Sequence, residues 1–205
     1  MELHEALLQI STIRRQLARS EQFRGYRAAP VALSGLLAVG AGGMQALWIA
    51  DPFQHLGLFL TLWIAVALLS LAICLGDVWW RHRHSAGLLH RETTRLAIAQ
   101  FAPCLVAGAL LTVVIVRSAP DAAWMLPGLW AILFSMGLFA SWRLLPRTIF
   151  GVAAWYLASG LWALSQGSHP SPLTPWTMPL LFGVGQLLSA AALLPSETER
   201  HGDAA

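Results

Sequence analysis

Six long apolar stretches, separated by short arginine-bearing segments, constrain this chain more than any other feature. They run from Pro30 to Ala50, Leu56 to Leu75, Leu96 to Val116, Trp124 to Ala140, Ile149 to Ser165 and Trp176 to Leu194. A helix needs about 17–25 apolar residues to cross a hydrocarbon core about 30 Å thick, and each stretch is close to that length. The sequence therefore predicts an all-α polytopic bundle of six transmembrane helices.

The distribution of basic residues predicts how this bundle is oriented. All 13 basic residues are arginines, and placing the amino terminus in the cytoplasm puts every one except Arg117 on the cytoplasmic side. Cytoplasmic loops of membrane proteins carry an excess of Arg and Lys. We therefore expect both termini to be cytoplasmic.

Composition excludes an ordinary soluble domain. The chain is 57% hydrophobic and 11% charged, whereas charged residues make up about 25% of soluble domains. We expect one six-helix domain over residues 30–195, preceded by an interfacial segment over 1–29 and followed by a short cytoplasmic tail over 196–205. The net charge of +3 is explained by orientation and by anionic headgroups of the inner leaflet, so no nucleic-acid partner is predicted.

The first 27 residues have the pattern of an amphipathic helix. Leu3, Leu7, Ile10 and Leu17 recur at helical spacing, and five arginines share the segment with them. Such a helix lies at the membrane surface with its apolar face in lipid. Docking on another protein, or on a cytoplasmic loop of this chain, is the alternative.

Small residues recur along three of the predicted spans, including Cys104, Gly108 and Thr112 in the third. Ser34, Ala38, Gly42 and Ala46 are four residues apart in the first span, and Gly151, Ala154 and Ala158 form a shorter row in the fifth. Small side chains let helices approach closely in a membrane, where packing must come from contact. We interpret these rows as helix-packing faces within one bundle, with a homo-oligomer interface as the alternative.

Three tryptophans fall deep within predicted spans, in contrast to those at the span boundaries. Trp63, Trp130 and Trp155 are interpreted as bulky core residues. The alternative is that they line a cavity for a flat apolar ligand.

The richest polar cluster surrounds the predicted loop after the second span. It consists of Arg81, His82, Arg83, His84, His90, Arg91 and Arg95, together with Asp77 and Glu92. We interpret it as a solvated loop that sets the topology. Contact with an anionic ligand or a lipid headgroup, and docking of a partner, are the alternatives. A metal site is disfavoured because the interleaved arginines repel a cation.

The chain lacks the residues that several classes of membrane protein need for their chemistry. All seven histidines lie in predicted loops or tails, away from the depth at which haem is ligated, and the absence of lysine excludes a retinal Schiff base. The chain has no Gly-x-Ser-x-Gly sequence, no His-Glu-x-x-His motif and no phosphate-binding loop. We therefore predict no catalytic residue, no cofactor and no metal site.

Three segments of the chain are similar to segments of other proteins: RGYRAAPVALSGLLA (Arg24 to Ala38), LPGLW (Leu126 to Trp130) and FGVGQLL (Phe182 to Leu188). They resemble an uncharacterised group of bacterial multi-span inner-membrane proteins. The resemblance implies a bacterial inner-membrane location and an interfacial amino-terminal helix, and it carries no activity.

The leading functional hypothesis is a non-catalytic inner-membrane protein that binds a partner, a lipid or an apolar ligand. One alternative is a transporter component that works with a separate ATPase, with a pocket lined by Trp48, His55, Trp124 and His169. Another is an enzyme that modifies lipid or quinone at the cytoplasmic face, using Asp77 and His82, His84 or His90.

Overall fold

The computed structural model describes residues 27–49, 51–84, 88–141, 147–167 and 173–202. Within these ranges it contains helices and no strand, which confirms the predicted all-α class. The elements are α2 (Ala28–Trp48), α3 (Leu56–His84), α4 (Leu88–Ser118), the short 3₁₀ segment η1 (Pro120–Met125), α5 (Leu126–Ala140), α6 (Ile149–Ser165), the π-helical segment η2 (Pro179–Gly183) and α7 (Val184–Gly202). The predicted amphipathic segment lies outside the described residues, apart from its last positions.

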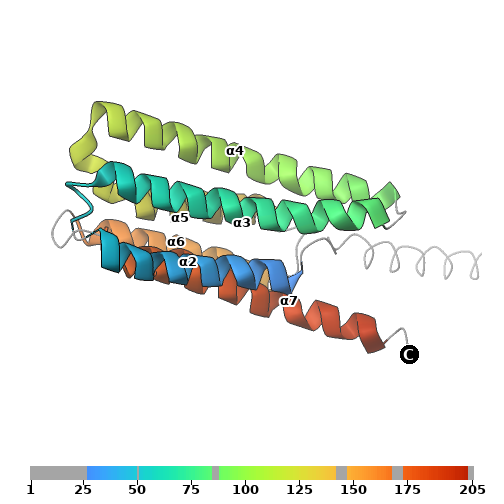
Figure 1. Cartoon of the computed structure of the whole chain (residues 1–205). Coiled ribbons are helices and arrows are strands. Elements are labelled where there is room, and N and C mark those ends of the chain that lie inside the picture. The colour runs from blue at the N-terminus through green and yellow to red at the C-terminus, as the bar shows by residue number, and fades with distance from the viewer. Residues whose placement is uncertain (1–26, 50, 85–87, 142–146, 168–172, 203–205) are drawn as a thin grey trace, which may run out of the picture.

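Four of these helical stretches are long and apolar enough to cross a membrane: Ala28–Trp48, Leu56–Trp80, Ala99–Ser118 and Pro120–Ala140. The apolar helices Ile149–Ser165 and Pro179–Leu194 are shorter. All of them run up and down along one direction (Figure 1). In hydrocarbon a helix satisfies its own backbone hydrogen bonds, and this is why apolar segments of such length adopt this form.

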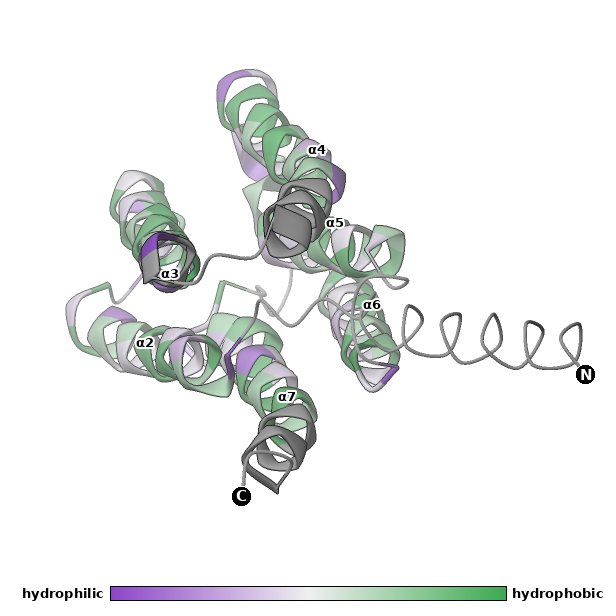
Figure 2. Ribbon diagram, turned by 90° about the vertical axis from the view of Figure 1, so that its right-hand side faces the viewer, coloured by the Kyte–Doolittle hydropathy of each residue, from purple (hydrophilic) through white to green (hydrophobic). Residues whose placement is uncertain are grey.

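The helices pack in an order that differs from their order in the sequence. The closest pairings are α5 with α6 and α2 with α7, while α3 packs on α2 and α4 on α5. The end-on view in Figure 2 shows α3 and α4, consecutive in the chain, as separate outer helices. Only 17% of the α3 span and 11% of the α4 span is buried against protein, compared with 39% for α2. Most of the core therefore lies among α2, α5, α6 and α7. Phe59, Leu60 and Trp63 of α3 and Ile115 of α4 complete it.

Arginines gather at one end of the bundle. Arg27, Arg83 and Arg147 are exposed there, where α2 and α6 begin and α3 ends. We call this the arginine end. The opposite end exposes Arg117 together with Asp51 and Asp121. Helix packing thus brings to one end of the bundle arginines that are many residues apart in the sequence.

Three helices extend past the apolar stretches from which they were predicted. α3 continues to His84, α4 begins at Leu88, and α7 runs to Gly202 through most of the predicted tail. The prediction that the polar cluster forms a loop is therefore wrong for all of its residues in α3 and α4. The end of an apolar stretch marks where burial in lipid would stop, whereas Arg and Glu are good helix formers in water and continue the helix.

Close helix contacts occur where glycines remove the side chain. A Cβ on Gly128 would lie 2.8 Å from the carbonyl oxygen of Gly160, and a Cβ on Gly160 would lie 2.8 Å from that of Gly128. These two glycines therefore allow the backbones of α5 and α6 to touch. On α2, a Cβ at Gly42 would collide with the ring of Pro179 and lie 2.8 Å from the carbonyl oxygen of Pro175.

Three of the four residues of the predicted packing face of α2 are buried. Ser34, Ala38 and Gly42 are buried, but Ala46 is exposed and the neighbouring Gln45 is buried in its place. The reason is geometric, because a spacing of four residues overshoots one helical turn by about 40°, or about 120° after three repeats. The buried face of α2 instead follows a mixed spacing of three and four residues.

Two similar hydrogen bonds join neighbouring helices in the half of the bundle away from the arginine end. The indole nitrogen of Trp63 donates to Gln45 Oε1 at 2.8 Å, and that of Trp130 donates to Thr112 Oγ1 at 2.9 Å. In both pairs the tryptophan follows its acceptor by 18 residues, across the turn of a helical hairpin. The hairpins α2–α3 and α4–α5 are therefore joined in the same way. Trp63 is buried in the core, and the half-buried Trp130 packs against it.

Candidate functional site

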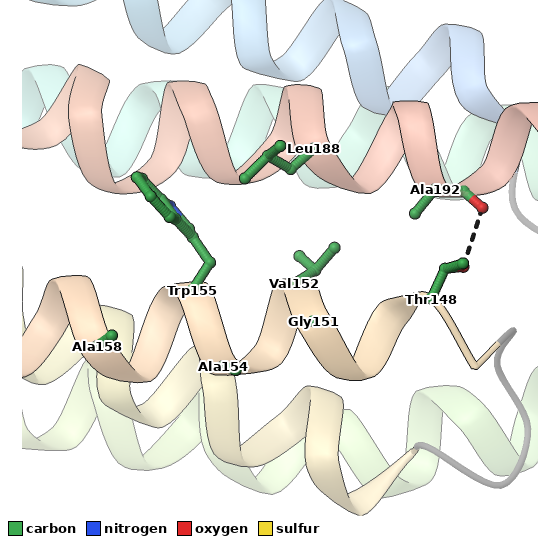
Figure 3. Close-up of a pocket in the computed structure, with 8 residues that line it drawn as sticks. All are labelled: Thr148, Gly151, Val152, Ala154, Trp155, Ala158, Leu188 and Ala192. Atoms are coloured by element: carbon green, nitrogen blue, oxygen red, sulfur yellow. Dashed lines mark hydrogen bonds between the residues drawn. The ribbon is translucent and has the colours of Figure 1, made fainter.

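A groove opens on the outer surface between α6 and α7 (Figure 3). Its volume is about 460 Å³, within the range of about 300–1,000 Å³ that is typical of small-molecule sites. Gly151, Ala154, Trp155 and Ala158 of α6, with Leu188 and Ala192 of α7, form most of its lining. The lining is almost entirely apolar, so the groove suits an apolar occupant.

The groove exists because small residues of α6 face it. Nothing lies within 4 Å of a Cβ built on Gly151, and Ala154 and Ala158 are exposed. The prediction that these three residues form a helix-packing row is wrong. The close contact of α6 is made by Gly160 against α5, on another face of the helix, and the small row leaves a space beside α7.

A hydrogen bond closes the groove towards the arginine end. Thr148 Oγ1 donates to the carbonyl oxygen of Ala192 at 3.1 Å and so links the start of α6 to α7. Arg147, the preceding residue, is exposed. Because the two helices are joined here, the groove is reached from the side of the bundle rather than along its axis from this end.

Trp155 forms the other wall of the groove. Figure 3 shows its ring rising from α6 towards α7, on the far side of Val152 from Thr148. Its Nε1 atom is buried and has no hydrogen-bond partner among the described residues. The residue lies seven positions after Thr148, about 10 Å along the helix axis. The Trp155 ring thus borders the groove, while its N–H is not part of the accessible surface of the groove.

The next residue of α6 faces the interior of the bundle. Tyr156 is 0% exposed, and its ring lies 4.7 Å from that of Phe134 and 5.6 Å from that of Phe182, measured between centroids. Its hydroxyl lies against Gly185 of α7 and also has no partner within the described part of the chain. Two consecutive residues therefore bring unpartnered polar atoms to the region where α6 meets α7.

Buried donors without partners are uncommon in proteins. Leaving such a group unsatisfied costs about 1–3 kcal/mol, which is why native structures pair most of them. Around Tyr156 the aromatic packing fills the space. Around Trp155, by contrast, the unpartnered N–H belongs to a ring that borders open volume. The open apolar volume itself is what makes the groove a candidate binding site.

The predicted anionic-ligand residues are distributed over two helices. Arg81, His82, Arg83 and His84 lie in the last turn of α3, and His90, Arg91 and Arg95 lie in the first turns of α4. Of their side chains only that of Arg83 is among those described. It is exposed, and its guanidinium carbon lies 3.8 Å from the centroid of the Trp79 ring. This cation–π contact keeps the arginine at the exposed surface of α3.

The residues predicted for a transporter pocket or for a lipid- or quinone-modifying enzyme are not gathered into one site among the described residues. Trp48 and His55 are exposed and Trp124 is half-buried, while His169 lies outside the described residues. Asp77 is half-buried on α3. Among the described residues no group of three His, Cys, Asp or Glu side chains is arranged to hold a metal ion.

Sequence reasoning identified the lining of the groove without identifying the groove. It singled out the row Gly151, Ala154 and Ala158 and the deep Trp155, but it assigned the row to packing and treated the tryptophan separately. Their proximity on adjacent turns of α6 was the available signal. The contribution of Leu188 and Ala192 required knowledge of which helix lies beside α6.

Comparison of the chain with protein-family models, with curated proteins and with solved structures found no match.

Proposed function

We propose that this chain is a six-span protein of the cytoplasmic membrane with both termini in the cytoplasm. The arginine end supports this orientation, since Arg27, Arg83 and Arg147 are exposed at one end of the bundle and only Arg117 among the described arginines lies at the other. The two shorter apolar helices, Ile149–Ser165 and Pro179–Leu194, pack side by side with the four longer ones and share their direction.

Within this membrane the protein binds an apolar ligand and performs no covalent chemistry of its own. The observation that carries this proposal is the groove between α6 and α7, which opens sideways to where the bilayer would lie. An occupant would enter from the hydrocarbon without passing through water. The groove offers apolar surface, with no nucleophile, acid or base in its lining except the hydroxyl of Thr148, which donates to the carbonyl oxygen of Ala192.

Saturable photolabelling tests this proposal. A decyl chain bearing a diazirine, added to liposomes containing the protein, should label the α7 peptide carrying Leu188 with a dependence on concentration that saturates. Bulk lipid contact would instead give labelling that rises linearly. Gly151→Phe places a ring in the groove and should remove the saturable component.

The matched control is Gly76→Phe. Gly76 lies on α3, is exposed, and has nothing within 4 Å of a Cβ, so its substitution changes an outer surface without touching the groove. Saturable labelling should persist in this variant. Linear labelling in the wild type, or saturable labelling that survives Gly151→Phe, would refute the proposal.

A further inference from the structure

We propose that the groove between α6 and α7 holds one acyl chain of an anionic phospholipid, whose phosphate lies against Arg147. This inference rests on the proposed function and specifies the class of its ligand. It is carried by the position of Arg147 relative to the groove, by the length of the groove and by the charge of the arginine end.

Arg147 lies on the same face of α6 as the small residues that border the groove. Arg147, Gly151, Ala154 and Ala158 are spaced by four, three and four residues, which places them within about 60° of one another around a helix. The N–H of Phe150 donates to the carbonyl oxygen of Arg147 at 3.1 Å, so the chain already turns helically at the arginine. Arg147 and the three small residues are exposed. The arginine is therefore aligned with the open side of the groove.

The hydrogen bond that closes the groove does not separate Arg147 from this open side. Thr148 is directed towards Ala192 of α7, and it lies about 100° from Arg147 around the helix axis. A lipid can therefore keep its headgroup beside Arg147 while one of its chains enters the groove from the bilayer. The Cβ of a helical residue points towards the helix N-terminus, so the arginine extends away from the groove towards the headgroups.

The length of the groove matches the depth of one leaflet. Its lining on α6 runs from Thr148 to Ala158, which is about 15 Å along a helix axis and half of a hydrocarbon core about 30 Å thick. The groove begins next to the arginine end. An acyl chain of a lipid in the leaflet on that side would therefore lie along the groove at the depth it already occupies in the bilayer.

The charge of the arginine end selects an anionic headgroup. A guanidinium group binds phosphate oxygens through parallel N–H···O hydrogen bonds. A zwitterionic headgroup brings a cation together with its phosphate, whereas Arg27, Arg83 and Arg147 already expose positive charge at this end. A headgroup with a net negative charge avoids this repulsion, so an anionic phospholipid should bind more tightly than a zwitterionic one with the same chains.

The saturable diazirine label tests the inference in two kinds of liposome with identical acyl chains. One consists of phosphatidylcholine, which is zwitterionic, and the other of phosphatidylglycerol, which is anionic. Because the uncharged decyl probe competes with lipid chains for the groove, its midpoint should be about fivefold higher in phosphatidylglycerol, equivalent to about 1 kcal/mol. Arg147→Gln should bring the two midpoints together. Arg147→Lys keeps the charge and should keep most of the difference.

Arg83→Gln is the matched control. It removes an exposed arginine from the same end of the bundle, but from α3, which does not line the groove. The difference between the two midpoints should stay as large as in the wild type. This control separates binding at Arg147 from a general effect of surface charge, and the saturable label itself reports that the groove is intact in each variant.

Failure of this inference is distinguishable from failure of the proposed function. If the label saturates but the wild-type midpoint is no higher in phosphatidylglycerol, the groove binds apolar chains without selecting a headgroup. The same conclusion follows if Arg147→Gln keeps the difference, or if Arg83→Gln reduces it equally. Each of these results overturns the present inference and leaves the proposed function standing. If neither liposome gives a saturable label, both proposals fail.

Discussion

Gln45 of α2 and Trp63 of α3 form a buried polar pair in which the amide makes two hydrogen bonds at once. Its oxygen accepts from the Trp63 indole at 2.8 Å, and its nitrogen donates to the carbonyl of Leu173 at 2.7 Å. Gln45 is 0% exposed. One side chain thus connects α2, α3 and the segment that precedes η2, close to the buried Phe59 and Leu60 of α3.

Replacing Gln45 by Leu should destabilise the bundle. The substitution leaves the Trp63 N–H without its acceptor and removes the hydrogen bond to the Leu173 carbonyl. A buried unpaired group costs about 1–3 kcal/mol, although interhelical hydrogen bonds in membranes average about 0.6 kcal/mol. We expect a lower melting temperature in detergent. Gln100→Leu is the control, because Gln100 is exposed on α4, and its melting temperature should stay near that of the wild type. Equal values for the two variants would show that the amide pair contributes nothing.

Gly42→Leu should disrupt the contact of α2 with the start of the last span. Even a Cβ at this position collides with Pro179, and overpacking typically costs about 1–3 kcal/mol. Gly40→Leu is the matched control on the same helix, since a Cβ there meets nothing within 4 Å. The melting temperature of Gly42→Leu should be clearly lower than that of Gly40→Leu. Gly40→Leu and a second control, Leu36→Ile, should both melt close to the wild type. A wild-type melting temperature for Gly42→Leu would contradict the packing described here.

The proposed topology predicts which positions react with impermeant reagents. In a background where Cys74 and Cys104 are replaced by Ala, a cysteine at Gln54 or Asp121 should be labelled from the periplasmic side of intact cells. Both positions are exposed at the end opposite to the arginine end. A cysteine at Ser85 should react only after the membrane is made permeable. Labelling of Ser85 in intact cells would reverse the orientation.

The amino-terminal segment is expected to bind anionic membranes as a helix. A peptide of Met1 to Arg27 should gain helicity, measured by circular dichroism, with vesicles rich in anionic lipid more than with zwitterionic ones, and salt should weaken the effect. Replacing Leu7 and Ile10 by Ser removes apolar area and should reduce binding. A peptide that stays unstructured on anionic vesicles would favour docking on a protein instead.

The sequence by itself determined the helical class, the approximate bounds of the apolar helices and the gathering of Arg27, Arg83 and Arg147 at one end of the bundle. These follow from local physics: apolar length sets what can lie in hydrocarbon, and charge sets which segments stay outside. α6, for example, begins at Ile149 and ends at Ser165, as its apolar stretch predicts. The local pattern did not show that α3 and α4 continue as helices through their polar residues. Hydropathy indicates whether a segment lies in lipid or in water, and it does not indicate whether its backbone is helical.

Only the tertiary structure decided what each small or polar residue does. Gly42 and Gly151 are both small residues in apolar helices, yet one lies against Pro179 and the other borders an open groove. Trp63 and Trp155 both lie deep in their helices, yet one has an acceptor and the other has none among the described residues. The difference depends on which helix lies opposite. That choice is made by packing between segments distant in sequence, and periodicity within one segment carries no information about its neighbour.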